Sequence, residues 1–364
     1  MIFIIKKNIL LKPLIMKSKI LPTILILLFV TAQVYACTTF FLNGEQKLFG
    51  RNFDFPSGVG HIYINPANIE KTSFIFPPEK PFTWVSKYGS ISFNQNGREM
   101  PYGGINEAGL VIEQMWHQEA KYPEPDQRKA LTELQWIQYH LDNSATVQDV
   151  INSDEKLRIS ITSVATLHFL VADASGDLAA IEFFDGKMVV HSGDELKYPV
   201  LSNCSYDVSL NYIATTNPNL EHTPWVENSS GRFKTAAGMI GAKDLKQKDK
   251  TAFAFEILDA VAQGESTRWS IVYDISNFKI HLKTNENKEV RTINFNEFDF
   301  SCTNTPLFID IDHANPSVKN FKPFNIEDNF NLIDKVCNEV EFLGQMPTEY
   351  RQAVAAFPAT FNCK

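Results

Sequence analysis

Tyr35-Ala36-Cys37-Thr38-Thr39-Phe40-Phe41 ends the apolar N-terminal segment of this 364-residue chain, and it decides how the rest is interpreted. We interpret Ala36 as the last residue of a segment that is removed, so that Cys37 becomes the first residue of the mature protein. Cys37 would then carry a thiol and a free α-amino group on the same Cα. The apolar residues that follow predict a strand over 38–42, which leads straight from the new N-terminus.

The residues before Cys37 have the pattern of a secretory signal peptide. A basic region precedes an apolar run over 21–30, which is shorter than the roughly 20 residues that a membrane span needs. The basic residues are Lys6, Lys7, Lys12, Lys17 and Lys19, and no acidic residue accompanies them. Met1 and Met16 are both candidate starts, because residues 16–36 form a complete signal by themselves. We therefore expect residues 1–36 to be cleaved and the protein to be exported, periplasmic or secreted.

The same stretch supports a second interpretation. Val34-Tyr35-Ala36-Cys37 also resembles the end of a bacterial lipoprotein signal, in which the cysteine is acylated. Tyr35 is bulky where that signal prefers a small residue, which counts against it. From this stretch alone both alternatives stay open, and the second would make the chain a lipid-anchored exported binding protein acylated at Cys37.

The size and charge of the chain limit the number of domains and the classes of partner that we expect. Removing 36 residues leaves 364 − 36 = 328, which a single layered α/β domain can accommodate. Lys plus Arg falls from 34 to 34 − 5 = 29 while Asp plus Glu stays at 42, so the net charge becomes 29 − 42 = −13. An acidic surface disfavours nucleic acid and an anionic membrane. The 28 Phe residues supply material for a core or an apolar pocket.

The other cysteines and the histidines show no metal-binding spacing. Four cysteines remain in addition to Cys37: Cys204, Cys302, Cys337 and Cys363. In an exported chain they allow two disulfides with three connectivities, and the pairing stays open. Cys302, Cys337 and Cys363 come late in the chain and suggest a disulfide within the C-terminal region. The eight histidines are scattered, and Asp310-Ile311-Asp312-His313 is interpreted as a solvated loop, so we predict neither a metal nor a cofactor.

Hairpins dominate the predicted elements. The first hairpin joins strands over 38–42 and 47–55 through the turn Asn43-Gly44-Glu45. Further strands are predicted over 111–116, 167–171, 178–184, 187–191, 269–274, 278–282 and 291–295. Helices are predicted over 131–141, 147–151 and 252–262, from Gly231 onward, and near 328–340. Without an alternating βαβ pattern, this order predicts an α+β fold with antiparallel sheets covered by helices.

The chemistry centres on the proposed N-terminal cysteine. An α-amino group has an unperturbed pKa of roughly 7.7–8.0, so it can act as a base near neutrality. A thiolate could then attack an amide carbonyl, with the amine passing the proton to the leaving nitrogen. A dyad of Cys37 with a histidine also stays open. Arg51 and Asp54 lie on the strand over 47–55, which pairs with the strand that follows Cys37. Their side chains should point to opposite faces of the sheet, unless a bulge or the end of the strand turns one of them.

Several short motifs in order carry a family resemblance. A mature N-terminal Cys-Thr-x-Phe is followed by these stretches: Gly50-Arg51-Asn52-Phe53-Asp54, Gly104-Ile105-Asn106-Glu107-Ala108-Gly109-Leu110, Leu201-Ser202-Asn203, Gly231-Arg232-Phe233 and Trp269-Ser270-Ile271-Val272-Tyr273-Asp274. Each motif alone is weak, but their order and spacing resemble the choloylglycine hydrolase family from Cys37 to about Phe300. This family of N-terminal-nucleophile amidases includes penicillin V acylases and conjugated bile salt hydrolases.

The resemblance implies a four-layer αββα sandwich and five catalytic residues. Cys37 would be the nucleophile, with Arg51 beside its sulfur to favour the thiolate. Asp54 would accept a hydrogen bond from the α-amine, and Asn203 would contribute to the oxyanion hole. Arg232 would hold the polar network, and its expected place in the first turn of a helix, where a cation opposes the dipole, already points to a specific partner.

The resemblance also bears on substrate. Trp116 occupies a position where some members have Asn or Tyr, so any oxyanion donor there would be its backbone N–H. A Trp at this position makes the chain resemble the subgroup of the family from Gram-negative bacteria. That subgroup is associated with penicillin V, long-chain acyl-homoserine lactones and, in gut bacteria, bile salts. Phe55 and Trp116 would bind an apolar acyl group. We interpret 37–302 as the amidase domain and 303–364 as an extension packing on it. Tetramers are common in the family, so a homotetramer is one assembly to test.

Overall fold

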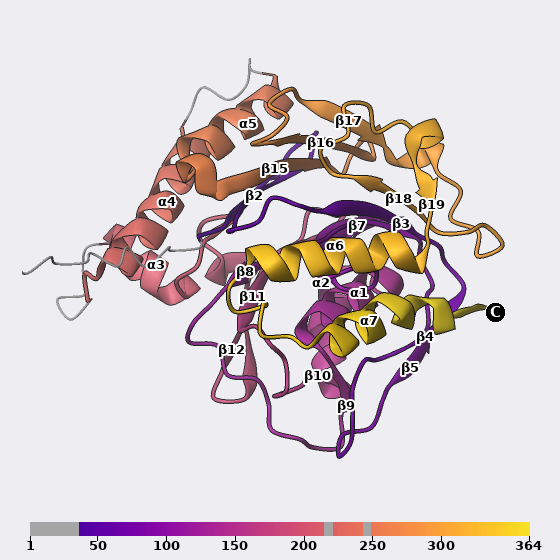
Figure 1. Ribbon diagram of the computed structural model, residues 1–364. Helices are drawn as coiled ribbons and strands as arrows, with labels where there is room; N and C mark the ends of the chain where they lie inside the picture. Colours follow the sequence, from indigo (N-terminus) through magenta and orange to yellow (C-terminus); the bar gives the residue numbers. More distant parts are fainter. Residues whose placement is uncertain (1–35, 215–220, 243–248) are drawn as a thin grey trace, which may run out of the picture. The chain divides into compact units, whose positions relative to one another are not determined.

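The strand that follows Cys37 lies inside a six-stranded antiparallel sheet (Figure 1). The computed structural model describes residues 36–214, 221–242 and 249–364. In this sheet the strand order is β14-β1-β2-β15-β16-β17. Its strands are β1 (Thr38–Leu42), β2 (Leu48–Asp54), β14 (Val200–Leu201), β15 (Thr267–Asp274), β16 (Lys279–Thr284) and β17 (Arg291–Asn294). β1 and β2 form the predicted hairpin, and all their residues are buried because both faces of the sheet are covered.

A second, nine-stranded antiparallel sheet has the order β13-β12-β11-β8-β7-β6-β3-β18-β19. Its strands are β3 (His61–Asn65), β6 (Ser90–Asn94), β7 (Pro101–Asn106), β8 (Val111–Trp116), β11 (Leu167–Ala172), β12 (Leu178–Phe184), β13 (Lys187–Ser192), β18 (Leu307–Asp310) and β19 (Lys322–Pro323). β18 pairs with β3, with Leu307 opposite Ile64. Residues after 303 therefore supply two strands of this sheet, and the sequence pattern predicts neither of them.

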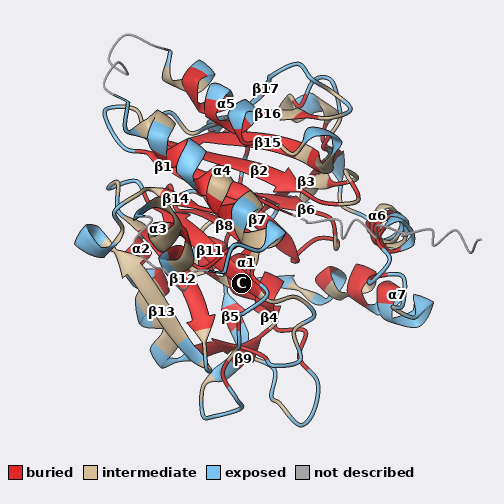
Figure 2. Cartoon of the chain, turned by 90° about the vertical axis from the view of Figure 1, so that its left-hand side faces the viewer, coloured by how far each residue is buried: buried red, intermediate tan, exposed pale blue. Residues whose placement is uncertain are grey.

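Helices cover the outer face of each sheet (Figure 1, Figure 2). α1 (Glu133–Asn143) packs on β7 and β8, and α2 (Val147–Asn152) follows it. On the other side, α5 (Lys250–Ala260) packs on β2 and β15, and α4 (Pro224–Ile240) packs on β1 and β14 beside α3 (Tyr206–Ala214). The layers thus run helix, sheet, sheet, helix, which confirms the predicted αββα sandwich of the α+β class.

The core lies between the two sheets. Tyr273 of β15 meets Phe93 of β6 edge-on, with 5.9 Å between ring centres, so aromatic side chains of the two sheets interlock. On the same side, Phe49 of β2 contacts Tyr273 at 6.2 Å. Aromatic pairs in such edge-to-face geometry add to the stabilisation that burial of their apolar area provides.

Smaller elements surround the sandwich. α6 (Ile326–Glu339) and α7 (Thr348–Ala356) pack against each other, and only α6 was predicted. A parallel pair joins β9 (Lys129–Leu131) to β10 (Leu157–Ile159), and a three-stranded sheet has the order β20-β4-β5, with β4 (Ile69–Thr72), β5 (Thr83–Val85) and β20 (Asn362–Cys363). None of the described helices is both long and apolar enough to span a bilayer.

The helix predicted to begin at Gly231 begins earlier, so that prediction was wrong. α4 starts at Pro224, with Thr223 as the N-cap whose side chain accepts a hydrogen bond from the backbone N–H of Val226. Proline at the first helical position and threonine before it are typical start signals, because proline has no N–H to leave unpaired. Arg232 therefore lies in the middle of the helix, and the dipole argument does not apply to it.

One disulfide forms among the described cysteines. Cys302 and Cys363 are joined, with 5.3 Å between their Cα atoms, which staples the C-terminal region as expected. Cys204 and Cys337 are buried free thiols, so the alternative of two disulfides does not occur in the part of the chain that the structure describes.

Candidate active site

Cys37 lies immediately before β1, and only 4% of its surface is exposed. Its thiol donates a long hydrogen bond to the backbone carbonyl of Asp54, with 4.0 Å between Sγ and O. The β1–β2 register explains this contact, because Thr38 pairs with Asn52 and the preceding cysteine comes level with the end of β2. The hairpin thus places the sulfur inside the fold, next to the last residues of β2.

Arg51 joins the two sheets beside the sulfur. Its Nη1 lies 2.6 Å from Oε2 of Glu113 on β8, and both side chains are fully buried. Its Nη2 donates to the backbone carbonyl of Gln114 at 3.4 Å, and its Cζ lies 4.8 Å from the centre of the Phe53 ring. Removing one member of a buried ion pair leaves an uncompensated charge and is strongly destabilising. Arg51 is therefore held in one position relative to the thiol.

The environment keeps the thiol protonated. Burial raises the pKa of the Cys37 thiol above its ordinary value, and the negative charge of Asp54 adds to this rise. The positive charges of Arg51 and Arg232 act in the opposite direction. Because burial has the largest effect, the thiol carries its proton at neutral pH. A base must remove that proton before the sulfur can act as a nucleophile.

Asp54 reaches the thiol because of its place at a strand end. It is the last residue of β2, and the paired strand β15 has a register shift between Thr267 and Trp269. The shift places an extra residue in β15, whereas Asp54 stands at the very end of β2, and Arg51 and Asp54 both act on the thiol. Asp54 Oδ1 accepts a hydrogen bond from Thr267, whereas Oδ2 is buried without a partner among the described residues. Burial raises the pKa of Asp54 to about 6, against the charges of Arg232 and Arg51.

Arg232 connects α4 to the start of β1. Its Nη1 donates to the backbone carbonyl of Cys37 and to Thr38 Oγ1, and its Nη2 donates to Asn203 Oδ1 at 3.0 Å. The amide of Asn203 is oriented by this bond, and its Nδ2 donates to the backbone carbonyl of Trp116 at 2.9 Å. Arg232 thus has the specific partners that its charge suggested, although the helix position was different.

A buried carboxylate that sequence reasoning missed supports Arg51. Glu113 pairs with Arg51 through Oε2 and accepts a hydrogen bond from the Tyr273 hydroxyl at Oε1. Gly103 lies opposite on β7, where a Cβ would approach the Glu113 carboxyl carbon to 2.1 Å. Burial raises the pKa of Glu113 to about 7. The available signal was a single acidic residue within the apolar strand Val111–Trp116.

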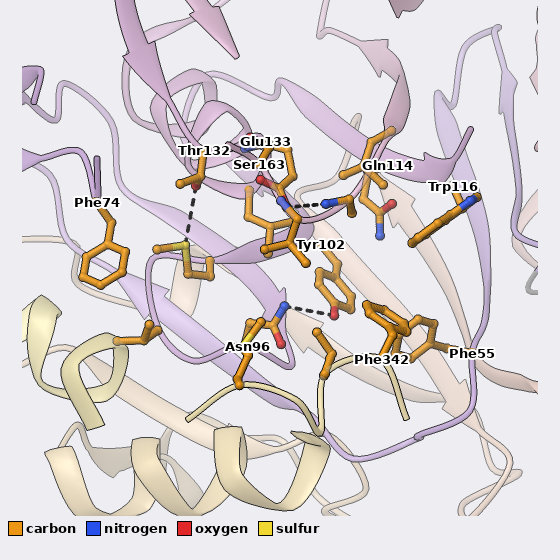
Figure 3. A pocket seen from close by; sticks show the side chains of 18 of the residues that line it. Phe55, Phe74, Asn96, Tyr102, Gln114, Trp116, Thr132, Glu133, Ser163 and Phe342 are labelled. Atoms are coloured by element: carbon orange, nitrogen blue, oxygen red, sulfur yellow. Dashed lines mark hydrogen bonds between the residues drawn. The ribbon is translucent and has the colours of Figure 1, made fainter. Parts of the chain in front are cut away.

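Cys37 opens into a mostly apolar pocket of about 240 Å³. Phe55 and Trp116, the two residues predicted to bind substrate, line it (Figure 3), and Asp54 lines it as well. Other apolar lining side chains are Phe53, Phe74, Phe76, Met100, Tyr102, Leu134, Val164, Ala165, Leu167, Phe342, Leu343, Met346, Tyr350 and Val354. The five predicted catalytic residues therefore meet in one place: two line the pocket and three hydrogen-bond to residues that line it.

A buried histidine cluster adjoins this site. His117, His168 and Glu182 place ligand-type atoms within 4.8 Å of one another. The rings of His117 and His168 stack at 4.5 Å and 18°, so their in-plane nitrogens are not directed at one point, as a shared metal ion would require. His168 instead contacts Glu182 Oε1 through Nδ1 at 3.0 Å and donates from Nε2 to the carbonyl of Ser202 at 2.6 Å. The cluster therefore fixes the residue before Asn203.

No histidine is among the described residues that line the pocket. The charged side chains that shift the Cys37 pKa are Arg51, Asp54 and Arg232. The geometry therefore gives no support to the alternative of a cysteine–histidine dyad. A base for the thiol has to come from another group close to the sulfur.

Comparisons with known proteins agree with this geometry. The sequence model of the family described as linear amide C–N hydrolases, choloylglycine hydrolase family, matches residues 37–243. Penicillin V acylase of Pectobacterium atrosepticum is 24% identical over 321 residues, covering 74% of this chain and 84% of that protein.

Solved structures share the fold. The structure of penicillin V acylase from Agrobacterium tumefaciens superposes with a TM-score of 0.67 at 25% identity, covering 80% of this chain and 98% of that chain. A variant of conjugated bile acid hydrolase from Clostridium perfringens gives a TM-score of 0.61 at 18% identity, covering 79% of this chain and 97% of that chain.

Proposed function

This chain belongs to the choloylglycine hydrolase family and is a hydrolase of linear amide C–N bonds, and from that premise we propose that Cys37, as the first residue of the mature protein, is its nucleophile. The observation that carries the proposal is the position of the Cys37 thiol. It is buried at the wall of an apolar pocket, between two arginines and a carboxylate. A cysteine that carries a lipid anchor would have to be exposed, so the burial supports the nucleophile over the lipid-anchored alternative.

The base in this proposal is the α-amine of Cys37 itself. The thiol has a raised pKa and no histidine lies among the described pocket residues, so the amine on the same Cα is the nearest candidate. Oδ2 of Asp54 is buried without a partner among the described residues, which leaves an acceptor for the α-ammonium once the preceding peptide bond is gone. An unperturbed α-amine titrates at roughly 7.7–8.0, close to neutrality.

The reaction then proceeds in two halves. The amine takes the thiol proton, the sulfur bonds to the amide carbonyl carbon, and the proton passes to the nitrogen as the C–N bond breaks. Water then attacks the thioester, and the sulfur leaves with its proton restored. Asn203 has one amide hydrogen engaged with Trp116, which leaves the other for the oxyanion together with the backbone N–H of residue 116. Arg232 holds Asn203 in this orientation.

Residues 1–36 are proposed to be a signal peptide that directs export and is removed to free the α-amine. Ala36 is fully buried against the site, so the residue whose removal the mechanism needs lies next to the catalytic groups. We propose a periplasmic or secreted location on the same ground.

The acyl part of the substrate is proposed to be apolar and uncharged. Aromatic and aliphatic side chains dominate the pocket, and burial of apolar area contributes roughly 25 cal/mol per Å². The acidic residue Glu133 also lines the pocket, but its carboxylate is hydrogen-bonded within the protein, where it accepts from the backbone N–H groups of Val164 and Ala165. Penicillin V, an acyl-homoserine lactone and a conjugated bile salt all have acyl groups of this kind. We rank a phenoxyacetyl group or a flexible acyl chain above the rigid steroid, because the Trp116 ring narrows the pocket.

Two forms of the chain test the mechanism. A protein that begins at Cys37 should hydrolyse at least one of the three amide classes. The same protein with Ala36 retained should bind substrate without turning it over, because its nitrogen is an amide. Full activity of the form that retains Ala36, shown by intact mass, would refute the mechanism.

Cys37→Ser should lower kcat by several orders of magnitude with an unchanged circular dichroism spectrum, since serine is a far weaker nucleophile.

The substrate ranking needs its own assay. The three classes should be compared side by side by kcat/KM with the form that begins at Cys37. Cleavage of glycine- or taurine-conjugated bile salts alone would contradict the ranking. An acylated Cys37, seen as added mass on the exported protein, would favour the lipid-anchored alternative.

A further inference from the structure

The C-terminal part of the chain builds one wall of the pocket. Five lining residues lie after the last residue of α6 or in α7, far from the residues 37–243 that the family's sequence model matches. They are Phe342, Leu343, Met346, Tyr350 and Val354, and all of them are apolar or aromatic. Sequence reasoning placed no substrate-binding role in this region. We call residues 326–356, which comprise α6, α7 and their connection, the C-terminal cap.

The connection within the cap is held in a fixed shape by Arg351. Its guanidinium donates to the backbone carbonyls of Met346 and Gly344 at 3.0 Å and 3.1 Å. It also donates to Asp334 and Asn338 of α6 at 2.8 Å and 3.1 Å. One buried side chain thus ties the loop, α6 and α7 together. Such a wall is preorganised and does not have to be ordered when a ligand binds.

The cap is also fastened to the sandwich. Asn329 of α6 accepts hydrogen bonds from the Tyr63 hydroxyl and from the backbone N–H of Arg98, and it donates to the carbonyl of Ala355. Ser57, which follows β2, donates to Glu339 at 2.6 Å. These bonds set the distance between the cap and the sheet that bears the nucleophile.

The cap contacts the pocket at two separate points. Near the nucleophile, the Phe342 ring meets Trp116 at 5.9 Å and Phe55 at 6.3 Å, both edge-on. Tyr350 of α7 meets Phe74 at 5.7 Å. Figure 3 shows Phe74 and Trp116 at opposite ends of the pocket, so the cap borders the whole length of the space. Phe342 is 41% exposed, an unusual exposure for a ring that forms part of an aromatic cluster.

We propose that the C-terminal cap determines acyl-chain length, with the acyl group extending from Cys37 past Phe342 to Tyr350 and Val354. The inference rests on the proposed nucleophile and narrows its substrate class to a flexible, unbranched acyl chain. A mostly apolar pocket that extends from Trp116 to Phe74, with the cap along its whole length, accommodates such a chain. A short acyl group would contact only the Trp116 end and would not depend on the cap's far residues.

Val354→Trp tests the proposal, with Gln352→Trp as its matched control on the exposed face of the same helix. Both are assayed in the form that begins at Cys37, on amides of butanoic and dodecanoic acid with the same amine. Val354→Trp should lower kcat/KM for the dodecanoyl amide roughly tenfold or more, which corresponds to losing the burial of about two methylene groups. Butanoyl turnover should stay within about twofold, and Gln352→Trp should change neither.

A second variant, Phe342→Ala, keeps the proposal testable if Val354→Trp does not fold. Phe342→Ala removes a partly exposed ring, so the fold should persist, and it should raise KM for both acyl lengths because both pass the near end. An equal loss on both amides in Val354→Trp, with Phe342→Ala unchanged, would overturn the cap's role while leaving the amidase proposal intact. Absence of turnover in the unmodified protein, with Cys37 alkylatable, would instead refute the proposed function.

Discussion

Two buried charges beside the proposed nucleophile explain why this site depends on more than Cys37. Arg51 reduces the pKa rise that burial imposes on the thiol, and Glu113 fixes Arg51 across the gap between the sheets. The pair therefore tunes the sulfur and ties the sheets together. Removing Arg51 alone would leave the Glu113 carboxylate buried without its partner, so Arg51 is tested against a Glu113→Gln control.

Arg51→Ala is expected to raise the pKa of the Cys37 thiol. The change should be made in a Glu113→Gln background, so that no lone carboxylate is left buried, with Glu113→Gln alone as the control. Loss of the adjacent cation disfavours the thiolate, so alkylation by iodoacetamide should need a higher pH than in the control. Identical pH profiles of alkylation in the two proteins would show that Arg51 does not act on the sulfur.

Glu113 is expected to make stability depend on pH. Its folded-state pKa is raised by burial from an ordinary value of 4.5 to about 7. Its stabilising contribution is therefore complete below about pH 4.5 and is lost as pH rises through about 7, because the unfolded chain ionises first. Glu113→Gln should remove this part of the decline, on the order of 3 kcal/mol, when urea unfolding at about pH 5 and about pH 8 is compared.

Asp54 has a raised pKa as well and remains in the Glu113→Gln variant, so some decline with pH should persist. The comparison between wild type and variant isolates the contribution of Glu113. An unchanged difference in unfolding free energy between the two pH values would mean that Glu113 is not the group responsible.

At the scale of elements, the ion pair depends on how β7 and β8 pair. Gly103 stands opposite Glu113 in this register, and the missing side chain makes room for the carboxyl group. Gly103→Ala should force the carboxylate away from Arg51 and lower the free energy of unfolding by roughly 1–3 kcal/mol, as overpacking does. Thiol alkylation should change at the same time. Thermal unfolding and iodoacetamide reactivity measure the two effects.

Gly231→Ala is the matched control for that substitution. It lies inside α4, where an added Cβ would meet nothing within 4 Å, and alanine is the better helix former by up to about 1 kcal/mol. The control should therefore be neutral or stabilising. Equal destabilisation by both changes would show that the effect is a general loss of glycine rather than contact with Glu113.

The strands of the first hairpin and most of the helices could be predicted because their patterns are local. Alternation, turn residues and helical spacing indicate an element without knowledge of its neighbours. The start of α4 was missed although Thr223-Pro224 is a local start signal. β18 could not be predicted in the same way, because a four-residue strand is fixed by the edge of β3 that it joins.

The candidate site could be predicted in part. The motif residues Arg51, Asp54 and Arg232 meet at Cys37, as the resemblance implied. Arg51 and Asp54 act on the same atom although alternation along a strand would place them on opposite faces, and no local pattern indicates that Asp54 is the residue at which β2 ends. Glu113 is bound to Arg51 only because two sheets face each other, and a contact between sheets leaves no spacing in the sequence.

At the scale of the whole molecule, the C-terminal residues belong to the same structure as the proposed nucleophile. β18 extends the large sheet, the C-terminal cap borders the pocket, and a disulfide closes this region. Disulfides persist in oxidising compartments, which supports the proposal that the protein is exported. The net charge of −13 expected after cleavage would keep such a protein away from anionic surfaces.

Loss of the Cys302–Cys363 disulfide is expected to destabilise the cap more than the site. The bond joins residues 61 apart in sequence, and the segment between them contains β18, β19 and both cap helices. Closing a loop of this length restricts the unfolded chain and typically adds roughly 2–4 kcal/mol. The double variant Cys302→Ser/Cys363→Ser should therefore unfold at a lower urea concentration. Because β18 and the Arg351 hydrogen bonds remain, it should still fold and cleave butanoyl amides near the normal rate.

Dodecanoyl amides should be more sensitive in that variant, with a raised KM, because their chain would rest on the cap. Cys363 is exposed, so mild reduction of the wild type is the matched treatment and should reproduce both effects, whereas the variant itself should not respond to reductant. If reduction left the urea midpoint and the KM for the dodecanoyl amide unchanged, packing alone would hold the cap in place, and the disulfide would serve only to secure the last residues of the chain.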